Sequence, residues 1–336
     1  MLWRMAEDRR RPLRADELAR IANAIDPRAR AAYCAPILGG LDAATYALDL
    51  EVAGERRELV VRIHTLENER DGDAARRYWK AISGIPESAR LPVPRPVHLD
   101  AEGGLVGLPC LVMTRLPGAP LARPTNVERW IDELAGALAA IHSVNATALP
   151  VDYLRAAEPA AVVEARLERS TPKTHEALWR EVADALRVAA PGVRSNGTVL
   201  THHDFWFGNT LWTGDRLTGI VDWDDARIDD PAFDVAYARG DVHFTFGGDA
   251  AARLRNRYEA RRGELRDMPF WDLVGILPAF RWLSDWVSGY HEVDRRDLTD
   301  ELAQERLESF VRSALAALSR DTGGGSTSSA AAPRAE

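Results

Sequence analysis

The feature that most restricts the fold of this chain is a change of hydrophobic period about one third of the way along its 336 residues. Before that point apolar residues alternate in short runs, which is typical of strands. After it they recur every three or four residues, which is typical of helices. A group of strands followed by a long series of helices indicates an α+β protein.

The first third predicts a small antiparallel sheet. Two strand-like runs, 45–52 and 58–63, flank Ala53, Gly54 and Glu55, and so predict a hairpin. Further strands are expected at 97–99 and 108–114, and helices at 14–25 and 74–82.

The remaining two thirds predict mainly helices. Thr125 and Glu128 have the spacing of a capping box at the start of the first of them. Later helices are expected at 159–169, 174–190, 231–243, 250–261, 270–289 and 300–318. Pro278 should divide or kink the helix that contains it, because proline lacks a backbone donor.

We therefore expect two lobes joined by a short connector near residues 114–118. The N-terminal, β-rich lobe would span 1–115 and the helical lobe 116–320. Residues 321–336 are of low complexity from Gly323 onward and are expected to be disordered. A cleft between two lobes is a common place for a ligand.

Charge and cysteine content exclude several classes of protein. Lys and Arg number 43 against 51 Asp and Glu, a net charge of −8, which disfavours general nucleic-acid binding. Cys34 and Cys110 are too few for a disulfide framework, and no apolar run is long enough to span a membrane. The charged N-terminus shows no secretory signal. We expect a cytoplasmic protein without nucleic-acid, membrane or obligate protein partners.

The strongest chemical signal lies in a strand-like island, 198–223, among the helices. A polar loop carries Asp204 and, five positions later, Asn209; a hairpin around Gly214 then leads to Asp222. A hairpin of this length should fold Asp222 back beside the loop, so that three oxygen-bearing side chains converge. One carboxylate can accept a proton from a substrate hydroxyl, while an amide and a second carboxylate can hold Mg²⁺. The pattern suits phosphoryl transfer.

These residues resemble the motifs of the aminoglycoside phosphotransferase family, part of the protein-kinase-like superfamily. The matching segments are His202-His203-Asp204 with Asn209, Val221-Asp222-Trp223-Asp224, and Asp230-Pro231 with Asp234. The resemblance covers about residues 36–318. It implies a kinase-like bilobal fold, with a small antiparallel-sheet N-lobe and a larger, mostly helical C-lobe.

The resemblance also implies roles for single residues. Asp204 would be the catalytic base, and Asn209 and Asp222 the Mg²⁺ ligands. The nucleotide, ATP or GTP, would bind through the covering loop at Gly39 and Gly40, the phosphate-binding position Arg62, the pocket residue Met113, and the backbone of Thr114 and Leu116. The γ-phosphoryl group would pass to a hydroxyl of a small molecule, with aminoglycosides, other antibiotics and sugar-like metabolites as candidates.

Two positions depart from the family pattern. Arg62 stands where the family has a phosphate-binding lysine; arginine keeps the charge but is longer and planar. Its acidic helix partner is not evident: the matching position falls at Arg77 or its neighbours, so Glu67 or Glu69 would have to pair with Arg62. His203 stands where the family commonly has glycine, and we expect the loop to tolerate it.

Several of these residues also have structural interpretations. His202 is expected to be buried and to bond the loop backbone, and His142 to pack against the loop. Asp230 should cap the helix that Pro231 begins, and Asp234 should share a structural role. The six aspartates of 222–234 can be read as metal ligand and caps, or as an acidic floor for a cationic acceptor.

Three other functions fit parts of the pattern. A nucleotide-binding protein without transfer activity is made plausible by Arg62. A protein kinase is disfavoured, because only eight residues separate Asp222 from Pro231 and no Ala-Pro-Glu follows. A metal-dependent phosphohydrolase would use His203 and Asp204 as a dyad, but no other histidine is suitably spaced.

Overall fold

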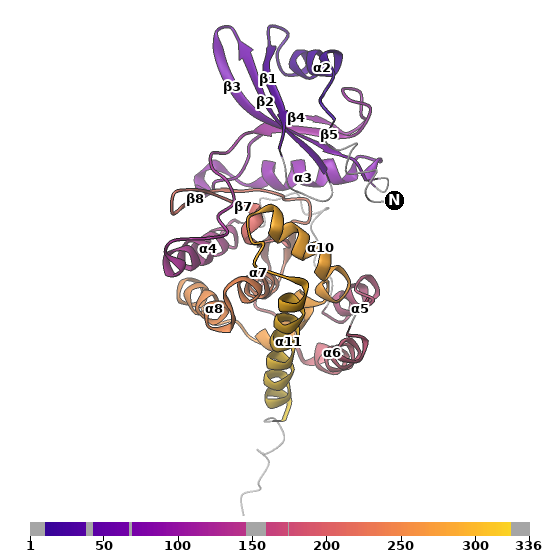
Figure 1. The fold of residues 1–336 in the computed structure, drawn as a ribbon, viewed down its shortest axis with the longest axis vertical. Helices are drawn as coiled ribbons and strands as arrows, with labels where there is room; N and C mark the ends of the chain where they lie inside the picture. The colour runs from indigo at the N-terminus through magenta and orange to yellow at the C-terminus, as the bar shows by residue number, and fades with distance from the viewer. Residues whose placement is uncertain (1–10, 38–42, 67–68, 146–158, 174, 324–336) are drawn as a thin grey trace, which may run out of the picture.

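The first part of the chain forms a five-stranded antiparallel sheet in the order β1, β2, β3, β5, β4. The computed structural model describes residues 11–37, 43–66, 69–145, 159–173 and 175–323. The strands are β1 (Arg30–Pro36), β2 (Ala43–Val52), β3 (Glu55–His64), β4 (Pro96–Asp100) and β5 (Cys110–Thr114), and the accompanying helices are α2 (Ala15–Ile25) and α3 (Asp73–Gly84). Figure 1 shows this lobe at one end and the main helices at the other.

The hairpin of β2 and β3 forms as the sequence predicts. The strands pair from Ala43 with His64 to Val52 with Glu55. Ala53 and Gly54 form the turn, and their φ angles of 52° and 89° are those that a type I′ turn requires. Strand β1, in contrast, was not expected, because its mostly exposed residues lack an alternating pattern.

The two faces of the sheet have different partners. Leu48 is buried in a cluster with Ile21 of α2, which covers the outer face. Met113 belongs to the larger core cluster that continues into the helical lobe. Val60 pairs directly with Met113 and so shares its face. Arg62, two positions further along β3, therefore also faces the helical lobe.

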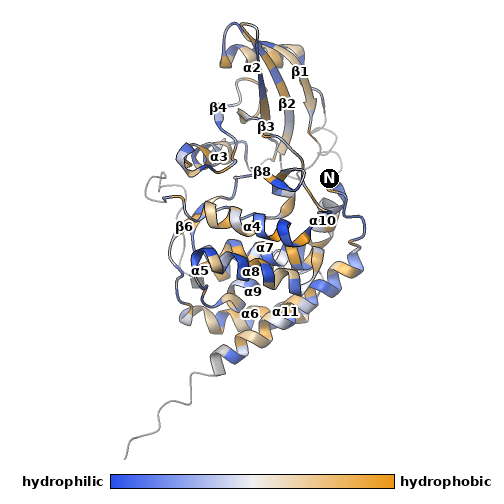
Figure 2. Ribbon diagram, turned by 90° about the vertical axis from the view of Figure 1, so that its left-hand side faces the viewer, coloured by the Kyte–Doolittle hydropathy of each residue, from blue (hydrophilic) through white to orange (hydrophobic). Residues whose placement is uncertain are grey.

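The rest of the chain is mainly helical. Its long helices are α4 (Val127–Ile141), α5 (Pro159–Arg169), α6 (Glu176–Ala189), α7 (Pro231–Phe246), α8 (Gly248–Arg262), α9 (Met268–Ile276), α10 (Ala279–Glu292) and α11 (Asp300–Gly323). Helix α7 is buried along most of its length. Figure 2 shows hydrophilic and hydrophobic residues alternating along α11, as expected for a helix with one buried face.

Two details of these helices test the sequence predictions. Pro278 divides the helix that contains it, since α9 ends at Ile276 and α10 begins at Ala279. The capping box at Thr125 is wrong: the N-cap of α4 is Asn126, whose side-chain oxygen accepts a bond from the Arg129 N–H at 3.0 Å. Asparagine caps at least as well as threonine, so the neighbouring position took this role.

Two pairs of short strands interrupt the helices. They are β6 (Val199–Thr201) paired with β9 (Arg227–Asp229), and the hairpin of β7 (Thr210–Thr213) and β8 (Arg216–Ile220). Figure 1 shows β7 and β8 between the sheet lobe and the helices. The predicted hairpin before Asp222 is thus present, and it lies at the junction of the lobes.

The connector crosses to the helical lobe directly after β5 and is fastened to this hairpin. Ala119 donates to the Trp212 carbonyl at 3.2 Å and accepts from the Trp212 N–H at 2.8 Å. Gly118 has a φ of 105°, and a Cβ at this position would lie 2.5 Å from the Trp212 oxygen. Only glycine fits this approach. The connector and the strand pair that precedes Asp222 therefore hold each other in place.

Three remaining expectations concern the chain as a whole. Cys110 is buried and Cys34 partly exposed, and both are free thiols. Over the described ranges, no helix is both long and apolar enough to cross a membrane. The lobe boundary after residue 115 stays a prediction. Residues 321–323, expected to be disordered, instead continue helix α11 to Gly323, and residues 324–336 lie outside the described residues.

Candidate active site

The polar loop after β6 is held by one buried carboxylate, that of Asp234 on the first turn of α7. Its two oxygens accept the backbone N–H groups of His202 at 2.6 Å and His203 at 2.8 Å. His142 contacts the same carboxylate at 3.2 Å. Burial opposes ionisation of Asp234, but the bonds from His142 and the loop outweigh it and lower its pKa. Asp234 is therefore a charged anchor for the loop.

The two histidines before Asp204 are both buried and bonded to neighbouring parts of the protein. His202 is fully buried, as expected, and its Nδ1 accepts the Asp204 N–H of the loop at 3.4 Å. Its Nε2–H donates to the Val221 carbonyl, outside the loop, at 3.0 Å. His203 has a φ of 66°, the left-handed region that favours glycine. Its ring stacks on Phe233, and its Nε2 lies 3.1 Å from Asp229. These contacts explain how a histidine is tolerated here.

Asp204 is held from two sides. Its Oδ1 accepts the hydroxyl of Tyr237 at 2.7 Å, and its Oδ2 accepts the side-chain amide of Asn209 at 2.7 Å. Burial raises the pKa of Asp204 well above its usual value, and the charge of Asp222 adds to the rise. The carboxylate is thus oriented by neutral donors and has an increased affinity for a proton.

The hairpin brings Asp222 to the same loop, as the sequence predicts. The Val221 N–H donates to the Asn209 carbonyl at 2.9 Å, which places the exit of β8 beside the loop. The Asn209 amide nitrogen donates to the Asp204 backbone and carboxylate. This leaves the side-chain oxygen of Asn209 available to a cation. Asp204, Asn209 and Asp222 therefore lie in one site.

The charges in this site fit a divalent cation. The carboxylates of Asp222 and Asp224 both pair with one guanidinium, that of Arg62, and the charge of Asp222 also acts on Asp204. Asp224 Oδ1 is buried without a hydrogen-bond partner among the described residues. Burial raises the pKa of Asp222 to about 6; Arg62 opposes this rise and Asp224 adds to it. Mg²⁺ prefers such oxygen ligands and relieves such repulsion.

Arg62 crosses from the sheet to these carboxylates. Its Nη2 lies 2.9 Å from Asp222 Oδ1 and also contacts Asp224 Oδ2. Burial disfavours its charge, but the two carboxylates outweigh this and raise the pKa of Arg62. The expected pairing with Glu69 is wrong, because Glu69 lies 3.3 Å from His64 instead. Glu67, the other candidate, and Gly39 and Gly40 lie outside the described residues.

The connector presents groups suited to a nucleotide base. Met113 is buried on the cleft face of the sheet, and Thr114 and Leu116 follow it. Among the described residues the Leu116 N–H has no hydrogen-bond partner, although this residue is only half-exposed. A backbone N–H without a protein partner is a donor that water or a ligand can use. It fits the expected role of this backbone in binding adenine.

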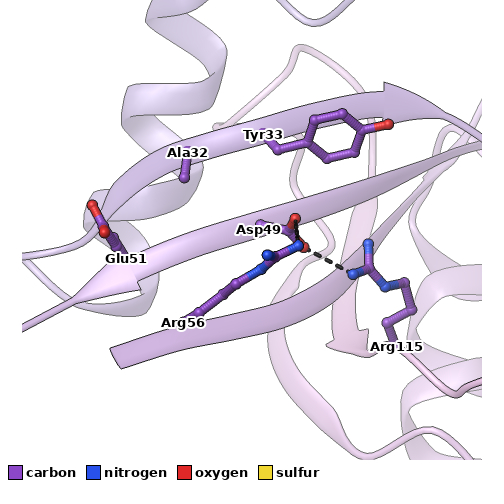
Figure 3. Close-up of a pocket in the computed structure, with 6 residues that line it drawn as sticks. All are labelled: Ala32, Tyr33, Asp49, Glu51, Arg56 and Arg115. Atoms are coloured by element: carbon purple, nitrogen blue, oxygen red, sulfur yellow. Dashed lines mark hydrogen bonds and ion pairs between the residues drawn. The ribbon is translucent and has the colours of Figure 1, made fainter. Parts of the chain in front are cut away.

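Arg115 fixes the connector to the sheet. Its Nη2 lies 3.0 Å from Asp49 on β2, and Figure 3 shows this pair on the wall of an open cavity of about 470 Å³. The cavity is lined by Ala32, Tyr33, Asp49, Glu51, Arg56 and Arg115. Asp49 follows Ala47 by two positions on β2, and Ala47 pairs with Val60, so Asp49 lies on the cleft face. The cavity therefore reaches the connector at Arg115, while Met113, Thr114 and Leu116 are not among its lining residues.

The sequence did not single out two tyrosines of this site. Tyr237 bonds Asp204, and the Tyr78 hydroxyl lies 3.2 Å from the backbone nitrogen of Asp222. Both tyrosines lie in helices, and an aromatic residue in a helical pattern is normally interpreted as part of the hydrophobic core. The position next to Arg77, where an acidic partner was sought, is the signal that could have pointed to Tyr78.

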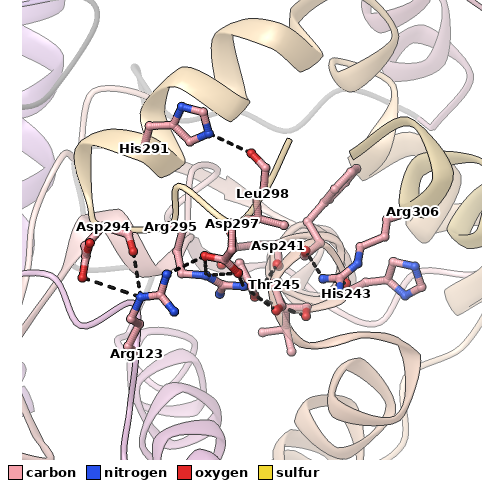
Figure 4. A network of polar contacts seen from close by, with 12 residues as sticks. Arg123, Asp241, His243, Thr245, His291, Asp294, Arg295, Asp297, Leu298 and Arg306 are labelled. Carbon is pink, nitrogen blue, oxygen red and sulfur yellow. Dashed lines mark hydrogen bonds and ion pairs between the residues drawn. The ribbon is translucent and has the colours of Figure 1, made fainter. Parts of the chain in front are cut away.

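A second polar network supports the turn that carries Asn209. Asp241 of α7 accepts the Phe207 N–H at 3.2 Å and the Tyr290 hydroxyl at 2.8 Å. Thr245, further along α7, accepts a hydrogen bond through its carbonyl from Arg295, which follows α10, at 2.9 Å. Figure 4 shows this network linking the end of α7 to the segment between α10 and α11. The turn before Asn209 is thus fastened to two helices.

Asp241 should make stability depend on pH. Burial raises its pKa to about 7, while Tyr290 and Phe207 oppose the rise. The folded protein then binds more protons than the unfolded chain between about pH 4 and 7, so this contribution to stability falls as pH rises. We expect the unfolding free energy of the parent, measured in urea, to be lower at pH 8 than at pH 5. This difference between the two pH values should be smaller in Asp241→Asn, which has no carboxyl group to titrate at this position. The control is Asp184→Asn, at an exposed aspartate, which should keep the difference of the parent. An equal difference in the parent and Asp241→Asn would contradict this assignment.

Comparison with known proteins identifies the family of this fold and site. The model of the phosphotransferase enzyme family matches residues 34–274. Among solved structures, a thermostable mutant of the aminoglycoside phosphotransferase APH(4)-Ia, in a ternary complex with AMP-PNP and hygromycin B, superposes with a TM-score of 0.57. The match has 19% identity and covers 84% of this chain and 95% of that one. The expected bilobal fold is thereby confirmed.

Curated relatives match over part of their length. A viomycin phosphotransferase of Streptomyces vinaceus is 33% identical over 171 residues, 47% of this chain and 58% of that protein. A homoserine kinase of Methylorubrum populi is 30% identical over 214 residues, 60% of this chain and 64% of that protein. The chain thus spans about three fifths of the length of these relatives. The family model, the relatives and the fold agree with the motifs around Asp204, and the chain belongs to the phosphotransferase enzyme family.

Proposed function

We propose that this protein transfers the γ-phosphoryl group of ATP or GTP to a hydroxyl group of a small molecule. The observation that carries the proposal is the carboxylate of Asp204, held by Tyr237 and Asn209 on the loop that Asp222 joins. A positioned carboxylate, an amide and a second carboxylate are the groups that phosphoryl transfer uses. The relatives named a viomycin phosphotransferase and a homoserine kinase support the reaction class.

Asp204 would accept the proton of the acceptor hydroxyl. Its raised pKa helps, because a base works best when its pKa lies near the working pH. Tyr237 and Asn209 hold both carboxylate oxygens, so the free lone pairs of Asp204 have a fixed direction. The residue would thereby orient the acceptor oxygen toward the phosphorus.

The nucleotide would lie between the sheet and the β7–β8 hairpin. Met113, Thr114 and Leu116 would bind the base, Arg62 the phosphates, and Gly39 and Gly40 the phosphates from above. The AMP-PNP in the APH(4)-Ia complex supports ATP as the co-substrate. Mg²⁺, when bound by Asn209 and Asp222, would neutralise charge on the transferred group.

The acceptor would bind on the α7 and α10 side of Asp204. Trp206, two positions after Asp204, is half-buried and lies across Gly208. The rings of Tyr237 and Trp286 meet at 6.1 Å. Five of the six aspartates in 222–234 are accounted for as ligands, caps or buried contacts. The sixth, Asp225, is exposed. The site therefore offers an aromatic wall with little free acidic charge.

The structure gives the phosphohydrolase alternative no support. His203 contacts Asp229 at Nε2 and Arg166 at Nδ1, at 3.1 and 3.3 Å. His202 uses Nε2 for Val221 and Nδ1 for the Asp204 N–H. Both rings are committed to the protein, so neither offers a nitrogen to a transition metal.

An acceptor screen tests the proposed function. The full-length protein, Mg²⁺ and ATP or GTP should form nucleoside diphosphate with at least one member of a panel of aminoglycosides, peptide antibiotics, macrolides and hydroxy amino acids. Mass spectrometry should then find one added phosphoryl group on that compound. Nucleotide binding without turnover across the panel would favour a binding protein, and phosphate release from monoesters without nucleotide would favour a hydrolase.

A further inference from the structure

The residue of helix α3 that contacts Arg62 is not acidic. The only acidic residue within α3 is Asp73, which pairs with Arg76 at 3.2 Å on the surface. The residue that meets Arg62 is Tyr78, whose ring centroid lies 5.5 Å from the guanidinium carbon. Tyr78 is 1% exposed, so this contact is shielded from water. Desolvation strengthens the attraction of a cation for an aromatic face.

Tyr78 also reaches the opposite side of the site. The Asp222 N–H donates to its hydroxyl oxygen at 3.2 Å. Asp222 has a φ of 67°, the left-handed region in which an aspartate is strained. A residue in such a conformation keeps it only where its surroundings fix it. The Tyr78 hydroxyl is one of the contacts that fix it, and the ion pair with Arg62 is another.

We propose that Tyr78 is a positioning residue for phosphoryl transfer and fills the place of the acidic helix partner. Its ring orients the guanidinium of Arg62, and its hydroxyl fixes the backbone of Asp222. The inference rests on the proposed function. It explains why arginine can stand at position 62. The guanidinium lies over the Tyr78 ring, 5.5 Å from its centroid, and also reaches Asp222 and Asp224, which a lysine ammonium cannot match in geometry.

A neutral partner has a consequence for charge. An acidic partner on α3 would neutralise Arg62, whereas Tyr78 leaves its full charge to the groups across the cleft. In this structure these groups are the carboxylates of Asp222 and Asp224. Phosphate oxygens are the natural replacement once a nucleotide binds, because arginine binds phosphate in a forked geometry. Tyr78 keeps the guanidinium in place during this exchange, since its ring contact does not involve the N–H donors.

Two substitutions separate the ring from the hydroxyl. Tyr78→Phe keeps the ring and removes the bond to Asp222, so kcat should fall by about 2–10-fold, with affinity for Mg²⁺·AMP-PNP nearly unchanged. Tyr78→Leu also removes the ring, so affinity for Mg²⁺·AMP-PNP, measured by calorimetry, should weaken by about 5–30-fold. Tyr46→Phe is the matched control, because Tyr46 is equally buried on the outer face of the sheet.

The outcomes distinguish positioning from packing. If Tyr78→Leu loses unfolding free energy in urea but binds Mg²⁺·AMP-PNP as the parent does, Tyr78 is a packing residue and the inference is wrong. The inference is also wrong if Tyr78→Phe and Tyr46→Phe lower kcat equally. The binding measurement needs no acceptor, so it decides the role of the Tyr78 ring even if the acceptor screen finds no turnover and the proposed function fails.

Discussion

Replacing Asp204 by alanine is expected to lower kcat by a factor of about 10²–10⁴, the usual share of a general base. The affinity for nucleotide should change little, because Asp204 lies beside the acceptor hydroxyl in the proposed site. The variant also leaves Tyr237 and Asn209 without their shared acceptor. Steady-state kinetics with an acceptor from the screen, together with calorimetry for Mg²⁺·AMP-PNP, would measure both effects.

The matched control for this experiment is Asp215→Ala. Asp215 lies in the turn of the β7–β8 hairpin, is exposed, and pairs only with exposed Arg129 among the described residues. Its loss should leave kcat unchanged. If Asp204→Ala keeps near-parental turnover, Asp204 does not act as the base, and the proton of the acceptor must go elsewhere.

The second large effect is expected for Asp234→Ala. This change removes the acceptor of two buried backbone N–H groups, those of His202 and His203, together with the partner of His142. Leaving such groups unpaired should cost about 3–5 kcal/mol of unfolding free energy. Urea unfolding followed by tryptophan fluorescence would measure the loss.

The control for this change is Asp184→Ala, because Asp184 is an exposed aspartate of α6. The loss in Asp234→Ala should exceed that of the control several-fold, and the folded fraction should show weaker turnover because the loop is no longer held. A loss below about 0.5 kcal/mol, the level of ordinary surface changes, would show that the loop is held by other contacts.

The sequence predicted those elements whose pattern arises locally. The alternation of 45–52 and 58–63, the divided helix at Pro278, and the cap at Asp230 all follow from spacing and from single-residue chemistry. Asp230 accepts the Ala232 N–H at 2.9 Å, with Pro231 in the first turn. Strand β1 was not predicted, because its residues are mostly exposed and its extended conformation is stabilised by pairing with β2.

The same distinction holds for the site. Asp204, Asn209 and Asp222 were predicted to converge because a hairpin of fixed length joins them. The contacts of Arg62 could not be predicted, because they join β3 to a segment 160 residues away in the chain. Tyr78 and Tyr237 look like ordinary core aromatics in the sequence, since only the tertiary fold directs their hydroxyl groups toward Asp222 and Asp204.

The central claim is that Asn209 and Asp222 share one divalent cation beside Asp204. The most direct test is a crystal structure of the full-length protein with Mn²⁺ and AMP-PNP, in which anomalous scattering locates the metal. We expect a peak bound by the Asn209 side-chain oxygen and the Asp222 carboxylate, with the terminal phosphate facing Asp204. A peak on other residues, or Asn209 and Asp222 bound to nothing in common, would contradict the account.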